Sequence, residues 1–274
     1  MKDNLQKRVQ RYGWDRAAGD YEAGWQRPLQ PAQDELLERA DLHPGQHVVD
    51  VACGTGLVTF SAADAVAPGG EVVGTDLSDG MIKRAEAIAE ERGIRNVMFE
   101  RMDAEKLDLP HDTFDVVLCS LGLMYVPDPE EALREMHRVL APGRQAVASV
   151  WGARTHCGWA AVFPIVDRRV ESDVCPLFFQ LGTGSALESA FRAAGFVSVT
   201  SNRLRTVLPF ESQQEACRAV FEGGPVAMAW RTFDVSTREA ARAEYREAVA
   251  PYANGRKVAI PGEFVITHGF KPSR

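Results

Sequence analysis

Two short segments of this chain carry groups that could hold a nucleoside. The first, residues 48–56 (VVDVACGTG), is an apolar strand pattern that runs into a glycine turn. Glycine has no Cβ, so the backbone of such a turn can approach a ligand closely. The second, residues 71–76 (EVVGTD), is another apolar strand pattern, and its final carboxylate could accept hydrogen bonds from both hydroxyls of a ribose. A strand, a glycine turn, a helix and a second strand ending in an acid predict a nucleoside-binding half-site.

The spacing after the glycine turn bears on which nucleoside is bound. Gly54 and Gly56 begin a G-x-G-x-x-G pattern, but Thr59 stands where the third small residue of a dinucleotide fingerprint belongs. The Gly-Lys-Ser/Thr ending of a phosphate-binding P-loop is absent from the sequence as well. The pattern therefore disfavours a nicotinamide-dependent oxidoreductase, which stays as an alternative.

The glycine turn also carries a resemblance to a known family. Residues 50–56 (DVACGTG) resemble motif I of class I S-adenosylmethionine-dependent methyltransferases, and the Ala-Cys variant resembles the branch that acts in ubiquinone and menaquinone biosynthesis. The resemblance covers about residues 10 to 150 and fades beyond them. It continues in the family's order through residues 74–78 with Met81, and through residues 102–105, 114–119 and 138–143.

The resemblance implies that S-adenosyl-L-methionine is the cofactor and S-adenosyl-L-homocysteine the product. The cofactor-binding positions that it implies are Asp50, Ala52, Cys53, Gly54, Gly56, Asp76, Leu77, Met81, Asp103, Ala104, Ser120 and Leu121. Asp76 would bind the ribose, Asp103 would accept from the adenine amino group, and Ser120 would lie beside the sulfonium. From the residues alone, Leu77 and Met81 could equally be core side chains, and Asp103 could cap a turn.

Strand and helix patterns alternate along the chain, which predicts an α/β fold. Strands are expected over residues 47–52, 71–76, 97–99, 114–119, 145–151, 197–208 and 263–270. Helices are expected from Pro31 to about Ala40, from the N-cap Ser78 to Gly93, after Pro129, and over residues 187–194. The resemblance implies a doubly wound, Rossmann-like sheet of seven strands in the order 3-2-1-4-5-7-6, with strand seven antiparallel.

Three segments lie outside this predicted sheet. We expect an N-terminal lid over residues 1–30, with Tyr21 and Trp25 approaching the cofactor, and a methyltransferase domain over residues 31–274. Insertions at about 152–184 and 211–262 are long enough to be helical lids over a substrate. Aromatic side chains gather in these segments, and we expect Trp159 and Phe163 to form a wall of the substrate site, although core packing explains any one of them as well.

Two side chains are candidates for acid–base work if the methyl acceptor must lose a proton. His156 lies five residues beyond the fifth predicted strand, and Tyr125 could orient a substrate oxygen. No sequence motif indicates a metal, so none is expected. The interspersed charges, with a net charge of −7, do not indicate nucleic-acid binding, and the five scattered cysteines are typical of a reducing, cytoplasmic environment. No apolar run has membrane-spanning length.

These patterns together predict methyl transfer from S-adenosylmethionine to a small, largely apolar or aromatic metabolite. A non-catalytic adenosylmethionine-binding protein is a further alternative, although the core motifs are intact. The sequence does not distinguish carbon, nitrogen, oxygen or sulfur as the methylated atom, and it does not distinguish a monomer from a homodimer.

Overall fold

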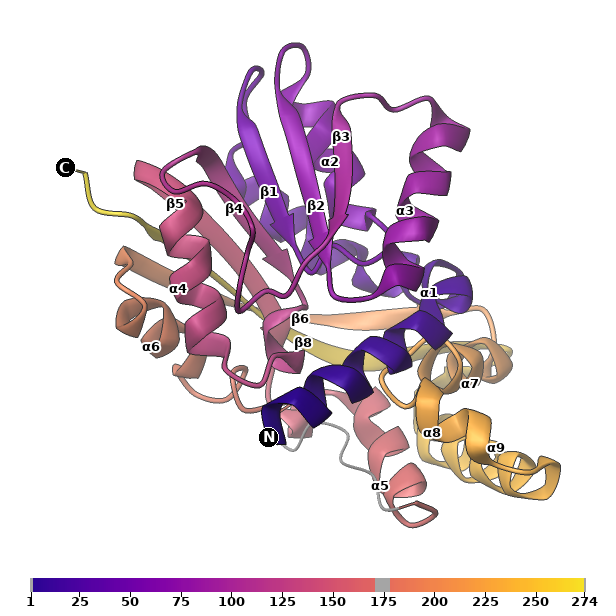
Figure 1. Ribbon diagram of the computed structural model, residues 1–274. Coiled ribbons are helices and arrows are strands. Elements are labelled where there is room, and N and C mark those ends of the chain that lie inside the picture. The colour runs from indigo at the N-terminus through magenta and orange to yellow at the C-terminus, as the bar shows by residue number, and fades with distance from the viewer. Residues whose placement is uncertain (1, 171–177, 274) are drawn as a thin grey trace.

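The computed structural model describes residues 2–170 and 178–273. A single mixed sheet forms its centre (Figure 1), with the strand order β3-β2-β1-β4-β5-β8-β6. Its strands are β1 (His47–Val51), β2 (Glu71–Asp76), β3 (Val97–Arg101), β4 (Phe114–Ser120), β5 (Leu140–Trp151), β6 (Val197–Phe210), β7 (Ala253–Asn254) and β8 (Lys257–Phe270). The two-residue β7 only pairs with β8, so β8 is the seventh long strand, and it runs antiparallel to β5 and β6. The predicted strand order and the antiparallel last strand are confirmed.

The parallel strands end at one edge of the sheet, and their register brings the predicted site residues together. Asp50 of β1 pairs with Gly74 of β2, and Asp76 at the end of β2 pairs with Arg101 at the end of β3. Strand β1 also pairs with β4, whose last residue is Ser120. Consecutive buried apolar residues, such as Val48 and Val49, are typical of strands covered on both faces.

Nine α-helices within the described residues accompany the sheet. They are α1 (Lys2–Ala40), α2 (Leu57–Val66), α3 (Asp79–Arg92), α4 (Pro129–Val139), α5 (Val162–Asp167), α6 (Ala186–Ala193), α7 (Gln213–Phe221), α8 (Ala227–Thr232) and α9 (Val235–Val249). Helices α4 and α6 pack on each other and on β5 and β6, respectively, while α1 contacts α2, α3 and the strands β4 to β6. None of the described helices is long and apolar enough to cross a membrane.

The first helix differs from the prediction. Pro31 does not begin a helix, because α1 runs without interruption from Lys2 to Ala40 and holds both Pro28 and Pro31 inside it. Each proline removes one N–H donor from the helix, which normally disfavours that position. Here Leu29 and Leu36 are buried in the central core, and this tertiary burial outweighs the local cost.

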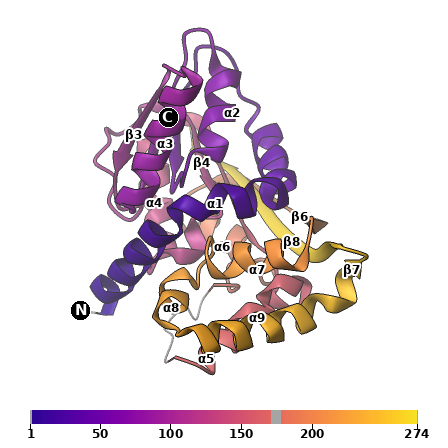
Figure 2. The ribbon, with the colours of Figure 1, turned by 90° about the vertical axis from the view of Figure 1, so that its right-hand side faces the viewer.

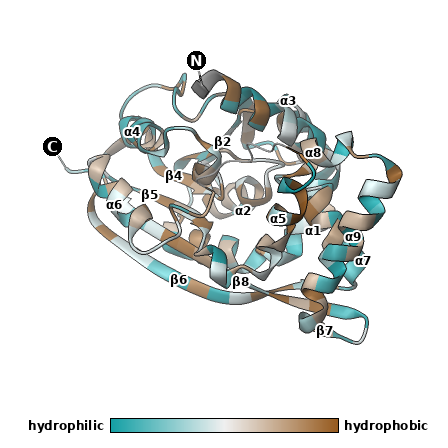
Figure 3. Ribbon diagram, turned by 90° about the horizontal axis from the view of Figure 1, so that it is seen from below, coloured by the Kyte–Doolittle hydropathy of each residue, from teal (hydrophilic) through white to brown (hydrophobic). Residues whose placement is uncertain are grey.

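The segment after β6 forms a second helical layer. Helices α7, α8 and α9 lie with α5 below the sheet, and α1 passes between this layer and α3 (Figure 2). Strand β8 begins at Lys257, earlier than the predicted residue 263, so the predicted insertion at 211–262 includes its first part. Of the predicted insertion at 152–184, residues 171–177 lie outside the described residues. Viewed from below, β6 forms the outer edge of the sheet (Figure 3).

Candidate cofactor and substrate site

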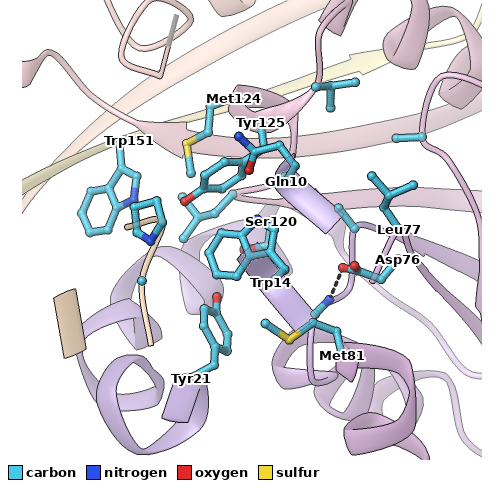
Figure 4. Close-up of a pocket in the computed structure, with 18 of the residues that line it drawn as sticks. Gln10, Trp14, Tyr21, Asp76, Leu77, Met81, Ser120, Met124, Tyr125 and Trp151 are labelled. Atoms are coloured by element: carbon cyan, nitrogen blue, oxygen red, sulfur yellow. Dashed lines mark hydrogen bonds between the residues drawn. The ribbon is translucent and has the colours of Figure 1, made fainter. Parts of the chain in front are cut away.

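A cavity of about 980 Å³, including the part that opens to solvent, lies where the parallel strands end (Figure 4). Most of the predicted site residues line it, namely Tyr21, Trp25, Ala52, Gly54, Asp76, Leu77, Met81, Asp103, Ala104, Ser120, Leu121, Tyr125 and Trp159. Asp76, Leu77 and Met81 lie toward one end of the cavity and Trp151 toward the other, with Trp14, Ser120 and Tyr125 between them. Different residues therefore line the two ends of the cavity.

The backbone is strained at two of the strand tips that line the cavity. Ala52, after β1, has a φ of 57°, and Leu121, after β4, has a φ of 60°. Side chains other than glycine rarely adopt this left-handed conformation, and such residues cluster at ligand-binding sites. The two tips lie against each other, since a Cβ added to Gly122 would lie 2.5 Å from the Cβ of Ala52.

The carboxylate of Asp76 holds the glycine turn in place. Its Oδ2 accepts a hydrogen bond from the backbone N–H of Gly54 at 2.9 Å, and its Oδ1 accepts one from the N–H of Ser78 at 2.8 Å. Burial raises the pKa of this carboxyl to about 6, against the two backbone hydrogen bonds that lower it. The carboxylate is thus fixed at the cavity edge and has lone pairs left for a ligand's hydroxyl groups.

Asp50 lies beneath the turn rather than in the cavity lining. Its Oδ2 accepts a hydrogen bond from Thr59 at 2.7 Å, while its buried Oδ1 has no hydrogen-bond partner. Burial and the negative charge of Asp76 together raise the pKa of this carboxyl to about 7, although the hydrogen bond from Thr59 lowers it. A buried carboxylate without a cationic partner is costly, and a cationic ligand beside it would relieve that cost. The carboxylates beside the glycine turn therefore fit a ligand with positively charged groups, such as the sulfonium and ammonium groups of adenosylmethionine.

Gly56 and Cys53 lie next to the cavity but do not line it. Gly56 precedes α2 with a φ of 89°, and a Cβ added to it would lie 2.7 Å from the ring of Phe60. Its lack of a side chain is needed for the helix start, not for space in the cavity. Cys53 is buried behind the turn, and burial raises the pKa of its thiol, so it is a packing residue in this structure.

One face of α1 supplies the side of the cavity that sequence patterns only partly identified. Lys7, Gln10, Trp14, Tyr21 and Trp25 all line it, at spacings of three, four and seven residues that fall on one face of a helix. Tyr21 and Trp25 were predicted, and the other three were missed because residues 1–30 were not treated as one continuous helix. The helical spacing in the sequence is the signal that could have found them.

Polar contacts fix α1 against the start of α3. Asp15 Oδ1 accepts hydrogen bonds from the Ser78 hydroxyl at 2.6 Å and from the Gly80 N–H at 2.9 Å. Ser78 Oγ in turn accepts from the Met81 N–H, as predicted for the N-cap of this helix. A Cβ on Gly80 would lie 3.0 Å from the Cα of Asp15, so the glycine permits the close approach. These contacts hold the start of α3, including Met81, against α1.

Aromatic rings form the opposite end of the cavity. The ring centre of Trp159 lies 5.6 Å from that of Trp25 and 4.9 Å from that of Trp151, which stacks on Phe264 at 4.3 Å. Phe163 does not line the cavity, but packs behind Trp159 at 5.4 Å. The other lining residues were not among the predicted site residues, and they are Leu29, Met102, Gly122, Met124, Val126, Pro127, Trp151, Gly224 and Pro225.

The two candidate acid–base residues occupy different places. Tyr125 lines the cavity, and its ring meets those of Trp14 at 4.9 Å and Phe178 at 5.1 Å. His156 lies outside the described lining, and its Nδ1 is 3.0 Å from the carboxylate of Glu263 on β8. Sequence reasoning could not see this pairing, because Glu263 is more than 100 positions away in the chain.

Known proteins resemble this chain in sequence and in fold. Residues 42–171 match a family described as a methyltransferase domain. Nocamycin O-methyltransferase from Saccharothrix syringae is 30% identical over 275 residues, which cover 95% of this chain and 98% of that protein. A demethylmenaquinone methyltransferase from Geobacillus stearothermophilus is 33% identical over 183 residues, or 60% of this chain and 76% of that protein. The solved structure of YcgJ from Bacillus subtilis has the same fold, with a TM-score of 0.62 and 19% identity, over 89% of this chain and 100% of that chain.

A doubly wound sheet with a nucleoside-sized cavity at its strand tips defines a class of cofactor-binding enzyme domain. The chain belongs to the class I S-adenosylmethionine-dependent methyltransferases and is related to those of ubiquinone and menaquinone biosynthesis. Its cofactor is S-adenosylmethionine.

Proposed function

We propose that this enzyme transfers a methyl group from S-adenosylmethionine to a small, largely apolar or aromatic metabolite. The observation that carries the proposal is a single cavity with two unlike ends. Carboxylates, a glycine turn and Met81 lie at one end, and the indole rings of Trp25, Trp151 and Trp159 lie at the other. Recesses lined by aromatic rings with few polar groups favour flat, apolar ligands. The small-molecule methyltransferases among its relatives support the same substrate class.

The lining residues have distinct roles in this proposal. Asp76 accepts from the ribose hydroxyls, Asp103 accepts from the adenine amino group, and Leu77 and Met81 enclose the adenine ring. The bound cofactor supplies an electrophilic methyl group on a sulfonium. Ser120 and Leu121, between the two ends, hold the acceptor atom in line with it, because methyl transfer is a displacement whose rate depends strongly on alignment. Tyr125 orients a polar group of the acceptor, and α1 with the later helices excludes water from the cavity.

His156 lies outside the described lining of the cavity, whereas Tyr125 is part of it. Its imidazole faces Glu263, which also accepts hydrogen bonds from Arg203 at 2.9 Å and Arg205 at 3.0 Å. This cluster joins the loop after β5 to the strands β6 and β8. We therefore assign His156 to the support of the fold in this proposal, and leave Tyr125 as the side chain that acts on the acceptor.

A screen of methyl acceptors tests the proposal. Phenols, hydroquinones, enols and aromatic amines would be incubated with methyl-labelled adenosylmethionine, and label in the product would be measured. We expect transfer to at least one apolar aromatic acceptor, with kcat/KM lowered by Tyr125→Phe and kept by His156→Ala. Tight binding of adenosylhomocysteine without transfer to any acceptor would favour the non-catalytic alternative. Binding of NAD in its place would favour the oxidoreductase.

A further inference from the structure

The adenine end of the cavity contains a cation that the proposed roles do not use. Among the described lining residues, Lys7 is the only lysine or arginine. It lies in the second turn of α1, and its Nζ is 2.7 Å from Oδ2 of Asp103. The same Nζ forms an ion pair with Glu105, so one ammonium group bridges two carboxylates that follow β3.

These contacts hold the Asp103 carboxylate from both sides. Lys7 donates to Oδ2, and the backbone N–H of Glu105 donates to Oδ1 at 3.0 Å. The Glu105 carboxylate is fixed in turn, because the N–H of Asp128 donates to its Oε1 at 2.8 Å. Without the ammonium group, two like charges would face each other with nothing between them, and each side chain could rotate away.

Lys7 keeps its charge in this setting. Partial burial lowers its pKa, but hydrogen bonds to Asp103 and Glu105 raise it, and the net shift is above the usual value. The cation is therefore present at neutral pH, where it can bridge the two carboxylates that it contacts.

The order of the strands places Asp103 opposite the base of a bound nucleoside. Gly54, Asp76 and Asp103 lie at or just beyond the ends of β1, β2 and β3, respectively, which are neighbours in the sheet. A ribose on Asp76, with the rest of the cofactor toward β1, directs its base toward β3. Asp103 and Asp76 are the two carboxylates of the described lining, so Asp103 is the acceptor available to an exocyclic amino group there.

We propose that Lys7 is a positioning residue for adenine recognition, which holds the Asp103 carboxylate in place and directed at the adenine amino group. The inference rests on the proposed binding of the cofactor in this cavity. It makes base recognition depend on α1, since the first helix must be in place for Asp103 to be fixed. The ion pair of Lys7 with Asp103 then serves both the preference for adenine and the attachment of α1 over the cavity.

A simpler role for Lys7 is to attach α1 to the core, and Arg11 provides the control for it. Arg11 lies one helical turn further along the same helix and pairs with Asp79. Neither Arg11 nor Asp79 lines the cavity. Removal of either cation weakens the attachment of α1, but only Lys7 touches the carboxylate opposite the base.

The test compares two ligands by calorimetry. S-adenosylhomocysteine carries the amino group, and S-inosylhomocysteine has a carbonyl in its place. The wild type should prefer the first, and Lys7→Met should lower that preference about tenfold, the size expected for loss of one well-placed hydrogen bond to a charged group. Arg11→Met should weaken the binding of both ligands equally and so keep the preference. Lys7→Arg should retain most of the preference.

The role of Lys7 would be overturned if Lys7→Met kept the wild-type preference, or if Arg11→Met lost as much of the preference as Lys7→Met. The proposed function would stand in either case. Absence of adenosylhomocysteine binding in the wild type would overturn both. Circular dichroism of each variant checks that the fold is intact, and loss of the preference in Lys7→Arg, which keeps the positive charge, would also contradict the proposed role.

Discussion

Replacement of Asp76 by asparagine tests the cofactor site through a change of charge with almost no change of shape. The wild-type carboxylate has a pKa of about 6, so it is ionised at pH 8, where both of its oxygens accept backbone hydrogen bonds. Asparagine has one acceptor oxygen, so the amide cannot satisfy Gly54, Ser78 and a ribose together. Hydrogen bonds to a charged group contribute about 1.5–3 kcal/mol. The affinity for adenosylhomocysteine should therefore fall by about 10- to 150-fold at pH 8.

The same substitution should change how binding depends on pH. If the ligand binds the ionised carboxylate, wild-type affinity at pH 5 should be about tenfold below its plateau, because one pH unit below the pKa leaves about a tenth ionised. The asparagine variant should lose this dependence. The pH dependence that remains in the variant comes from Asp50. Its midpoint should shift to lower pH, because the negative charge of Asp76 that raises the pKa of Asp50 is gone.

Calorimetric titration with adenosylhomocysteine between pH 5 and pH 8.5 measures both effects. Asp64→Asn, an exposed position on α2, is the matched control, and its affinity should equal that of the wild type. Equal affinity of the wild type and Asp76→Asn at pH 8, with the same slope against pH, would remove Asp76 from the ribose site.

Three further results are expected. Gly54→Val should abolish cofactor binding in a folded protein, whereas Gly56→Ala should lower the Tm because its Cβ would meet Phe60; calorimetry and thermal unfolding would show this, and an unchanged Tm for Gly56→Ala would contradict it. Hydrogen exchange in residues 5–22 should slow when adenosylhomocysteine is added, and removal of residues 1–16 should weaken its binding; equal exchange with and without ligand would mean that this part of α1 is no lid. Glu263→Gln should destabilise the fold at pH 7. Although burial raises the pKa of Glu263, hydrogen bonds from His156 and Arg205 bring it down to about 2. The depressed pKa stabilises the fold above pH 4.5, and this contribution is lost as the pH falls toward 2. Wild type and Glu263→Gln should therefore converge in urea unfolding at low pH, and a constant difference would refute the pairing.

The parallel half of the fold follows from local sequence patterns. Consecutive buried apolar residues such as Val48 and Val49 are typical of strands covered on both faces, and the acid at position 76 ends such a strand at the edge of the cavity. Ser78 and Gly93 cap α3 as predicted, because capping depends on residues within one turn. These local signals predicted most of the residues that line the Asp76 end of the cavity.

The remaining parts of the site depend on contacts between distant segments. Pro31 indicated a helix boundary, and the burial of Leu36 and its neighbours outweighed that signal. The position of Lys7 near Asp103 joins residues 96 positions apart, and the position of His156 near Glu263 joins residues 107 positions apart. No periodicity in the sequence specifies such pairs.

A crystal structure of the protein with S-adenosylhomocysteine tests the central claim most directly. The account predicts one ligand in the cavity, with both ribose hydroxyls within hydrogen-bond distance of Asp76. It also predicts the adenine between Leu77 and Met81, and the sulfur beside Ser120. Ligand density outside the cavity, or a ribose that does not contact Asp76, would contradict it.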